Sequence, residues 1–317
     1  MTTHIDPARI AAADAADAAD AAQPADQAAE PVEFGGVTRG RLVLRRFLRR
    51  RLALFGLACL AALFVLAFVG PYLTPWEYTS KDFSAFLRPP SVTHWFGTTQ
   101  IGQDVFAQTM RGLQKSLIIG LCAAVFSTGL AAVVGAFAGY FGGRIDRALM
   151  WLTDLLLVLP ALLIIAILSP AFRGRSWLLF VALLAALSWM ITARVVRGMA
   201  LSLREREFVQ AARFMGVSGP RIIFRHLLPN MSSLLIIDAT INVATMILLE
   251  TSLSYFGFGV QPPDTSLGTL IGEGTRSALT FPWLFLFSGG LLILTVLSVS
   301  FVGDGLRDAL DPNARTR

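Results

Sequence analysis

Three acidic residues stand inside long apolar stretches of the sequence, where a charge is costly. Asp154, Asp238 and Glu250 interrupt runs built otherwise from aliphatic and aromatic residues. At lipid depth such a side chain costs about 2.5–3.5 kcal/mol on insertion scales, so it usually faces a bundle interior or an aqueous path. Two hypotheses follow. The acids could line a solute pathway, or they could form interhelical hydrogen bonds as protonated carboxyls.

The other reactive residues show no catalytic or metal-binding arrangement. Neither Lys81 nor Lys115 follows a glycine, so the phosphate-binding pattern Gly-x-x-x-x-Gly-Lys-Ser/Thr is missing and the chain cannot cradle ATP itself. The three histidines are scattered along the chain, at His4, His94 and His226. Ser, His and acidic residues have no spacing typical of a nucleophilic triad. We therefore expect no catalytic residue, no cofactor and no metal.

Composition points to a membrane protein. Apolar residues make up 55% of the 317 residues, charged residues 15%, and the mean hydropathy is +0.63. These values argue against a soluble enzyme, a disordered scaffold and a nucleic-acid-binding domain. Six stretches have the roughly 20 apolar residues that a bilayer requires: 52–73, 116–143, 148–172, 176–193, 231–263 and 277–303. The predicted fold class is an all-α polytopic membrane protein with six transmembrane helices.

The arginines predict the orientation. With the N-terminus inside, twenty of the 27 basic residues lie on the inner side and seven on the outer side. Under the positive-inside rule this split favours N-in and C-in topology. The net charge of +6 is thus explained without a nucleic acid.

Other features divide the chain and shape its helices. Residues 1–38 repeat an Ala-Ala-Asp triplet and carry several prolines, so we predict a disordered cytoplasmic tail before a transmembrane domain at 39–317. Gly135, Gly139 and Gly143 form two overlapping GxxxG steps that predict close helix packing. Pro160 and Pro170 predict a kink or end of the third helix.

The long inner loop, about 194–230, predicts two short helices. The first covers 203–216 and stops at Gly216, and the second begins with Ser218-Gly-Pro220 and ends at Pro229. Phe208 and Met215 recur at helical spacing within the first of these helices. On periodicity alone, this segment could be an amphipathic hairpin that anchors to lipid headgroups.

The residues of this loop resemble a known motif. Gln210-Ala-Ala-x-x-x-Gly216, nine residues and then His226-x-Leu228-Pro229 are similar to the EAA loop of ABC importer permeases. The resemblance implies a coupling helix that docks on a separate ATPase subunit. Its residues here would be Glu207, Gln210, Ala211, Ala212, Gly216, His226, Leu228 and Pro229. The family's glutamate is Gln210 in this chain, which keeps the size and hydrogen bonding but loses the charge.

The resemblance extends over residues 41–312 and is to the C-type permeases of dipeptide and oligopeptide (and related nickel) ABC importers. Matching blocks include His94-Trp-Phe-Gly-Thr98, Gly139-Tyr-Phe-Gly-Gly-Arg-Ile-Asp146 and Gly303-Asp-Gly-Leu-Arg-Asp-Ala-Leu-Asp-Pro312. It implies a multi-pass protein of the bacterial inner membrane, paired with a homologous B-type permease, two ATPase subunits and an extracytoplasmic peptide-binding protein. Asp238 is then the favoured acid to meet a peptide's amino terminus, because Asp154 and Glu250 also fit acids of the family's helices.

The chain departs from the family at Thr99 and Gln103, where an aspartate and an arginine are usual. Because one negative and one positive charge are missing together, we expect these two positions to contact each other.

Other functions remain open at this point. If the chain belongs to an ABC importer, nickel or another small solute is the nearest alternative to a peptide as the transported substrate. A proton-coupled carrier that uses Asp154, Asp238 or Glu250 is the rival from a different class, and it leaves the EAA-like loop unexplained. An intramembrane enzyme would need a convergent catalytic set that the sequence does not contain.

Overall fold

The computed structural model describes residues 39–169 and 177–310. Over these residues the chain is helical and contains no strand, apart from an isolated bridge between Thr98 and Asp104. The predicted all-α fold class is confirmed. The predicted tail at 1–38 and Pro170 lie outside the described residues.

Four helices are long and apolar enough to cross a membrane. They are α3 (Arg51–Val69, extended by the 3-10 turn η1, Gly70–Tyr72), α4 (Val105–Phe141), α11 (Leu228–Tyr255) and α13 (Trp283–Leu310). A short helix, α2 (Arg39–Phe47), precedes α3. These four helices match four of the six predicted apolar stretches, although α11 ends at Tyr255 rather than at 263.

The other two predicted spans are broken helices. Helices α5 (Gly143–Val158) and α6 (Ala161–Leu168) meet at 76°, and α7 (Trp177–Ala186) and α8 (Met190–Arg204) meet at 48°. Pro160 lies in the first break, which confirms the kink predicted there, because proline lacks the N–H that would continue the helix. The predicted count of six holds if each bent pair is one span.

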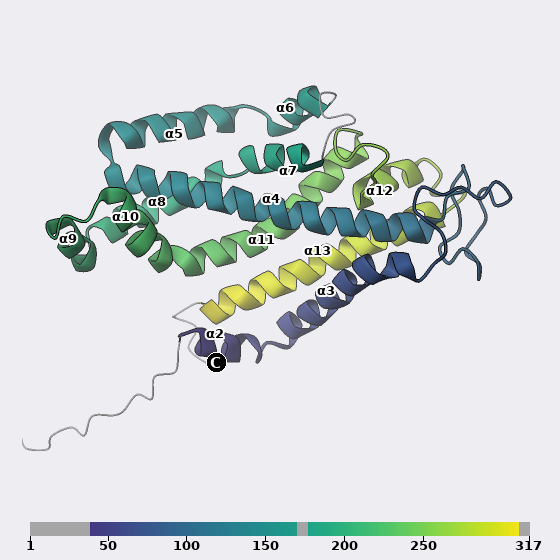
Figure 1. The fold of residues 1–317 in the computed structure, drawn as a ribbon, viewed down its shortest axis with the longest axis horizontal. Coiled ribbons are helices and arrows are strands. Elements are labelled where there is room, and N and C mark those ends of the chain that lie inside the picture. The colour runs from purple at the N-terminus through teal and green to yellow at the C-terminus, as the bar shows by residue number, and fades with distance from the viewer. Residues whose placement is uncertain (1–38, 170–176, 311–317) are drawn as a thin grey trace, which may run out of the picture. The chain divides into compact units, whose positions relative to one another are not determined.

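Helix α4 is at the centre of the described helices, because α8 and α11 pack along it, whereas α3 packs mainly on α13 and meets α4 near its start (Figure 1). Its glycines allow this approach. A Cβ atom at Gly139 would lie 2.6 Å from the Ala200 Cβ, and one at Gly135 would lie 2.8 Å from the Val196 Cβ, both on α8. Gly143 has no atom within 4 Å of such a Cβ. The predicted GxxxG packing is therefore confirmed for the first step and wrong for the second.

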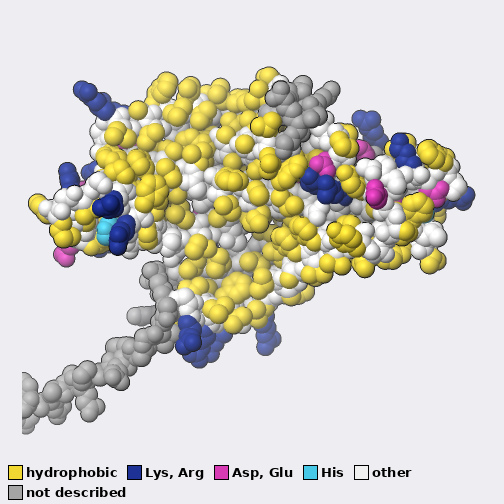
Figure 2. All heavy atoms as spheres, in the orientation of Figure 1, with side chains coloured by type: hydrophobic (Ala, Val, Ile, Leu, Met, Phe, Trp, Pro, Cys, Tyr) yellow, Lys and Arg dark blue, Asp and Glu magenta, His cyan; other side chains and the backbone are white. Residues whose placement is uncertain are grey.

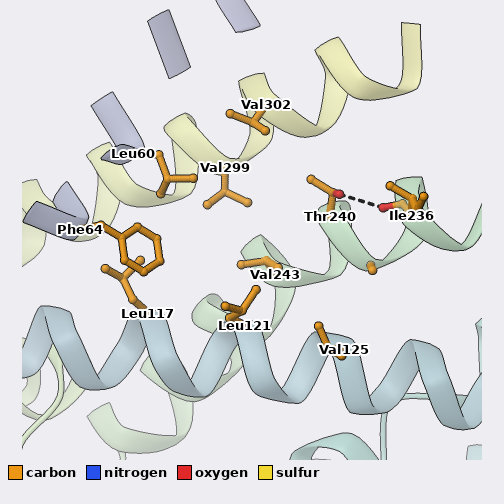
Figure 3. Close-up of a pocket in the computed structure, with 11 residues that line it drawn as sticks. Leu60, Phe64, Leu117, Leu121, Val125, Ile236, Thr240, Val243, Val299 and Val302 are labelled. Atoms are coloured by element: carbon orange, nitrogen blue, oxygen red, sulfur yellow. Dashed lines mark hydrogen bonds between the residues drawn. The ribbon is translucent and has the colours of Figure 1, made fainter. Parts of the chain in front are cut away.

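An apolar groove lies between four of the helices, and many large hydrophobic side chains are exposed on the outer surface of the bundle. The groove lies between α3, α4, α11 and α13, holds about 320 Å³, and is lined by residues such as Phe64, Leu121, Val243 and Val299 (Figure 3). Figure 2 shows hydrophobic side chains over the middle of the visible face, with most charged side chains toward its two ends. This distribution suits a bundle surrounded by lipid.

The predicted helix end at Pro229 is wrong. Helix α10 (Gly219–Ile222) runs through a π-helical turn, η3 (Ile223–Leu227), into α11, so one continuous helix covers Gly219–Tyr255. In the π turn the Leu228 N–H bonds the Ile223 carbonyl, five residues back. Pro229 follows directly after this turn, so its missing N–H falls where the π turn has already interrupted the regular α-helical hydrogen bonds.

One long loop region and a further short helix belong to the described part of the chain. Residues 73–104 connect α3 to α4 without a long helix. Helix α12 (Leu267–Thr275), for which no expectation was made, starts with a capping box in which Ser266 and Thr269 exchange side-chain and backbone hydrogen bonds. Figure 1 shows residues 73–104 and α12 at one end of α4, and α9 (Glu207–Phe214) and α10 at the other.

Candidate coupling segment and membrane-embedded acids

The segment between α8 and α11 folds as two short helices around a glycine turn. Two residues separate α8 from α9, and Gly216 lies just beyond the end of α9 with φ of +77°. A side chain would be strained in this left-handed conformation, which glycine adopts freely. Ser218 stands at the N-cap of α10, as predicted, but its side chain makes no capping hydrogen bond. The first predicted helix, 203–216, is in fact divided between α8 and α9.

One face of α9 is fixed to the bundle. Val209 and Ala212 are 1% and 2% exposed, and they pack in one apolar cluster with Ile222 and Ile223. Ala136 of α4, Val196 and Ala200 of α8 and Met231 of α11 belong to the same cluster. The helix is therefore held against three membrane helices rather than resting loosely beside them.

Large hydrophobic residues are exposed on the remaining surface of α9 and beside it. Phe208 is 41% exposed, Phe214 90% and Met215 76%, and Phe224 in η3 is 54% exposed. Basic and hydrophobic side chains lie side by side at this end of the molecule (Figure 2). An exposed apolar group of this kind, rimmed by charges, is typical of a protein–protein contact.

The predicted coupling residues divide between buried and exposed positions around α9 and the start of α11. Glu207, Ala211 and Gly216 are exposed, whereas Ala212 is buried. The half-buried Gln210 donates a long hydrogen bond of 3.5 Å to Glu205. His226 lies in η3, and Leu228 and Pro229 lie in the first turn of α11. The side-chain amide of Asn230 donates to the His226 backbone carbonyl at 2.6 Å.

Asp154 is paired with an arginine. Its carboxylate on α5 forms an ion pair with Arg194 on α8, and both side chains are more than half exposed. Asp146 and Arg197 link the same two helices through two hydrogen bonds of 2.5 and 2.6 Å. Sequence reasoning placed Arg194 and Arg197 in the inner loop and so missed both pairs, which tie α5 to α8.

Glu250 is enclosed by hydroxyl groups. It has no exposed surface, and it accepts hydrogen bonds from Ser116 at 2.9 Å and Ser254 at 2.6 Å. The Ser116 oxygen also accepts from the Leu267 amide at the start of α12. Glu250 therefore ties α11 to α4 and α12, and no bulk solvent reaches it in this chain.

Asp238 is half-buried near the middle of the Gly219–Tyr255 helix. It accepts hydrogen bonds from Thr128 at 2.8 Å, Thr192 at 3.0 Å and Asn242 at 2.9 Å. The three donors come from α4, α8 and α11. Sequence reasoning missed them, although polar residues inside predicted spans are a signal that finds them.

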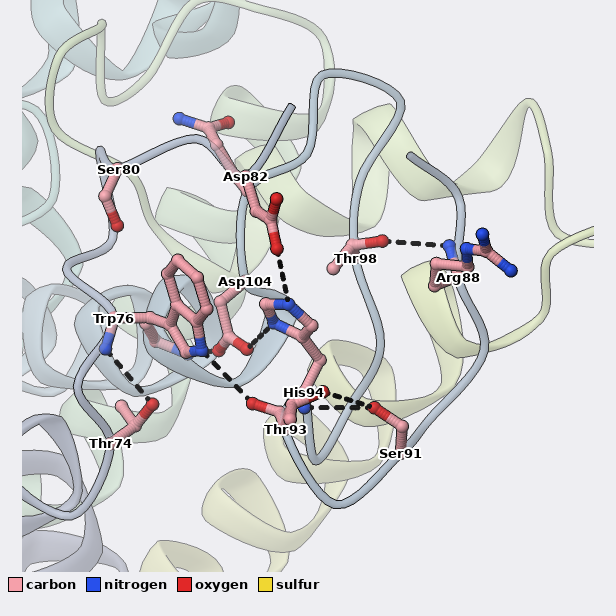
Figure 4. Close-up of polar contacts among 12 residues, drawn as sticks. Thr74, Trp76, Ser80, Asp82, Arg88, Ser91, Thr93, His94, Thr98 and Asp104 are labelled. Carbon is pink, nitrogen blue, oxygen red and sulfur yellow. Dashed lines mark hydrogen bonds and ion pairs between the residues drawn. The ribbon is translucent and has the colours of Figure 1, made fainter. Parts of the chain in front are cut away.

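The far end of α4 is fixed by a buried histidine. His94 Nδ1 lies 2.8 Å from Asp104, its Nε2 lies 3.5 Å from Asp82, and its ring stacks on Trp76 (Figure 4). Asp104 also caps α4 by accepting from the Ala107 amide at 2.8 Å. The hydrogen bonds from Ser84 hold the pKa of the Asp82 carboxyl below its ordinary value of 3.8. This network orders the 73–104 region around the start of α4.

Two basic residues of α4 share one carboxylate at the same end. Lys115 Nζ lies 2.8 Å from Asp264, and Arg111 lies 2.9 Å from it. Burial raises the pKa of Asp264, but the hydrogen bonds and charges of Lys115 and Arg111 outweigh it and hold this pKa below its ordinary value of 3.8. Lys115 also sits over the Trp177 ring at 4.6 Å. The loop before α12 is thereby fastened to α4 and α7.

Known proteins resemble this chain over nearly its whole length. Residues 131–316 match the family described as binding-protein-dependent transport system inner membrane component, and residues 38–90 match the N-terminal TM domain of oligopeptide transport permease C. The oligopeptide transport system permease protein OppC of Mycobacterium tuberculosis is 57% identical over 280 residues, which cover 88% of this chain and 96% of the relative.

More distant relatives agree. A putative peptide permease protein of Brucella suis is 41% identical, over 85% of this chain and 89% of the relative, and OppC of Bacillus subtilis is 33% identical, over 90% and 94%. These similarities confirm the resemblance drawn from the sequence blocks, and the relatives are transport permeases rather than enzymes. The chain therefore belongs to the family of binding-protein-dependent transport system inner membrane components, as a multi-pass inner-membrane permease subunit of the C type found in oligopeptide ABC transporters.

Proposed function

We propose that this chain is one half of the membrane pathway of an ABC importer for oligopeptides. Relatives that bear the name oligopeptide transport system permease cover almost the whole chain. The other parts of the importer are a homologous B-type permease, two ATPase subunits that hydrolyse ATP, and an extracytoplasmic binding protein that delivers the peptide. Both termini face the cytoplasm, which puts α9 and α10 on the ATPase side.

The observation that carries this proposal is the packing of α9, which is buried on one side and exposes large hydrophobic residues elsewhere. Val209 and Ala212 anchor the helix in the bundle, whereas Phe208, Phe214 and Met215 extend from it. A rigidly held helix with protruding aromatic anchors suits docking in a groove of another protein. The uncharged Gln210 agrees with docking by shape and apolar contact.

The path of the chain supports transmission of movement from α9 to the membrane. Helix α8 enters α9 through a two-residue link, and α10 continues without a break into α11. A displacement of α9 would therefore act on two membrane-crossing elements together. In this mechanism, closure of the ATPases on ATP moves α9, and the bundle alternates between inward and outward opening.

A comparison of two exposed hydrophobic residues tests the proposal. Phe214→Ala removes the 90% exposed anchor of α9, and the control Leu279→Ala removes a fully exposed leucine between α12 and α13, at the other end of the molecule. Both variants are produced in the complete importer and reconstituted in proteoliposomes. The measurements are co-purification of the ATPase subunits, ATP hydrolysis stimulated by the peptide-loaded binding protein, and peptide uptake.

We expect Phe214→Ala to lower stimulated hydrolysis and uptake about tenfold or more, as for a hot-spot residue of an interface, with Leu279→Ala close to the wild type. Uptake that continues without the ATPases, driven by a proton gradient, would refute the importer. Equal behaviour of the two variants would remove α9 from the coupling role and leave peptide import standing.

A further inference from the structure

A polar cavity lies beside Asp238. It holds about 340 Å³ and is lined by Ser188, Thr192, Asp238, Asn242 and Thr245 together with apolar side chains such as Leu157 and Met246. Its size falls in the range of small-molecule sites, and convergent polar groups on an apolar wall are typical of such sites. The apolar groove of Figure 3 contrasts with it, because that groove contains a single polar residue, Thr240.

The carboxylate in this cavity has hydrogen-bond donors but no counter-charge. Thr128, Thr192 and Asn242 all donate to Asp238 and all are neutral. Among the described residues no arginine, lysine or histidine forms an ion pair with it, whereas Asp146, Asp154 and Asp264 each have a basic partner. Glu250 also has hydroxyl donors and no basic partner in this part of the chain, but it is fully buried and does not line the cavity. Asp238 is therefore positioned, by three helices, as an anionic group whose charge is uncompensated.

Two interruptions of regular helix meet at the same cavity. Leu157 belongs to the last turn of α5 before the 76° break, and Ser188 lies in the 48° break between α7 and α8. In membrane transport proteins, non-helical backbone at membrane depth occurs where it lines a cavity or a solute site. The breaks and the carboxylate thus mark one place in the bundle.

We propose that this cavity binds a primary ammonium group, namely the free amino terminus of the peptide in transit, with Asp238 as its counter-ion. The inference rests on the proposed function and assigns one contact of the cargo. A protonated amine supplies the positive charge that Asp238 lacks. The apolar part of the lining, with Leu157, Met190 and Met246, gives room for the first side chain of a peptide.

A bare inorganic cation fits the cavity less well. The volume is many times that of one ion, and half of the lining residues are apolar. A hard cation prefers a close shell of six or more oxygen atoms, and Asp238 is the one carboxylate among the cavity's lining residues. The other alternative is that Asp238 only joins the three helices by hydrogen bonds and binds no ligand. The experiment below distinguishes this alternative from amine binding.

The experiment compares Asp238→Asn with Thr192→Val in the complete importer. Asp238→Asn removes the charge and keeps an oxygen that accepts hydrogen bonds, whereas Thr192→Val keeps the charge and removes one donor. Uptake into proteoliposomes is measured for a peptide with a free amino terminus and for its N-acetylated form, at equal saturation of the binding protein. Any preference of the binding protein for one of the two peptides affects wild type and variant equally, because each variant is compared with the wild type on the same peptide.

For Asp238→Asn we expect uptake of the free peptide to fall about tenfold or more, since one member of a desolvated charge pair is lost, with the acetylated peptide unchanged. Thr192→Val should keep the preference for the free amine. An equal loss on both peptides, no loss, or a requirement for Na⁺ that Asp238→Asn abolishes would overturn the proposal. If the wild type carries no acetylated peptide, equal effects of the two variants on the free peptide would overturn it.

A wild-type importer that takes up neither peptide refutes the proposed function instead, whatever Asp238→Asn does. The melting temperature and the basal ATP hydrolysis of each variant show whether it has folded and assembled.

Discussion

The three acids that interrupt apolar stretches of the sequence differ in how their side chains are surrounded. Asp154 neutralises its charge with Arg194, and Glu250 is surrounded by serine hydroxyls with no solvent contact. Asp238 has donors without a cation. Neither Glu250 nor Asp238 has a basic partner among the described residues, but only Asp238 of the two lines a cavity that an external group could enter. Because an unneutralised group is costly in this environment, Asp238 is the acid that an external cation can reach.

At Asp264 the ion pair predicts a dependence of stability on pH. Asp264→Asn should lower stability by about 2 kcal/mol at neutral pH, because the buried Lys115 loses its counter-ion; fully buried pairs cost more. The pKa of Asp264 is lowered by folding, so its contribution is present above the ordinary value of 3.8 and is lost as the pH falls through the folded value. Melting temperatures of wild type and variant should thus differ at neutral pH and converge as the pH falls below the lowered pKa of Asp264.

A pH-independent difference between these melting curves would contradict the assignment. Asp308→Asn is the control, because its carboxylate pairs with Arg50 at an exposed site, where both side chains are more than half exposed. Such a pair contributes little, about 0–1 kcal/mol.

Thr99 and Gln103 give a second prediction at the residue scale. The structure places them together, since the backbone N–H of Gln103 donates to the Thr99 hydroxyl at 3.0 Å and the backbone N–H of Thr99 donates to the Gln103 backbone carbonyl at 2.9 Å. The Gln103 side chain itself bonds Tyr78 and Gln108. Thr99→Asp alone adds a carboxylate to a loop that already holds Asp82 and Asp104, so the yield of folded protein should fall. Thr99→Asp with Gln103→Arg should restore it. Equal yields of the single and double variants would show that the two positions are independent.

At the scale of elements, the structure is organised by where helices approach and where they break. Helix α4 passes closest to α8 at two glycines, whereas α5–α6 and α7–α8 change direction in mid-course. The close contact makes α4 and α8 one unit. The breaks leave room beside that unit for the polar cavity around Asp238.

Gly139→Ala should lower the melting temperature of the chain. The added Cβ would lie 2.6 Å from the Ala200 Cβ and from the Arg197 carbonyl oxygen, and such overpacking costs about 1–3 kcal/mol. The matched control is Gly129→Ala on the same helix, where no atom lies within 4 Å of the new Cβ. This control should be neutral or stabilising by up to about 1 kcal/mol. Thermal unfolding in detergent measures both, and identical shifts would contradict the packing assignment.

The positions of the membrane-crossing helices were largely predictable from the sequence, because the length of each apolar stretch determines where a chain can cross a bilayer. Proline predicted the break at Pro160 for a local steric reason. The same rule gave a wrong end at Pro229, since the π turn directly before this proline depends on packing of Ile222, Ile223 and Leu227 in the interior. Local pattern cannot report such tertiary compensation.

The candidate sites were predictable in part for the same reason. The glycine turn at Gly216 and the acids in apolar runs are visible in the sequence. The partners of those acids are not, because Thr128, Thr192 and Arg194 lie 40 or more residues from the acids they contact. Which of the three acids has a basic partner, and which lines a cavity, are therefore properties of the folded bundle.

At the scale of the whole molecule, topology is the prediction to test. Arg144 at the start of α5 and Leu279 before α13 are both exposed, and they flank opposite ends of the membrane-crossing helices. With Cys59 and Cys122 replaced by alanine, Leu279→Cys should react with an impermeant thiol reagent on intact cells. Arg144→Cys should react after permeabilisation. The reverse pattern would invert the orientation and place α9 away from the ATPases.

The bend between α5 and α6 has a consequence for the surrounding lipid. Helix α5 has 16 residues, so it rises about 24 Å, against a hydrocarbon core of about 30 Å. Because α6 departs from its axis at 76°, it adds little height. Acyl chains beside this edge must compress to match it, which costs a fraction of a kcal/mol for each ångström of mismatch. We therefore expect the free-energy cost of this mismatch to rise with bilayer thickness and to be smaller in membranes with shorter acyl chains.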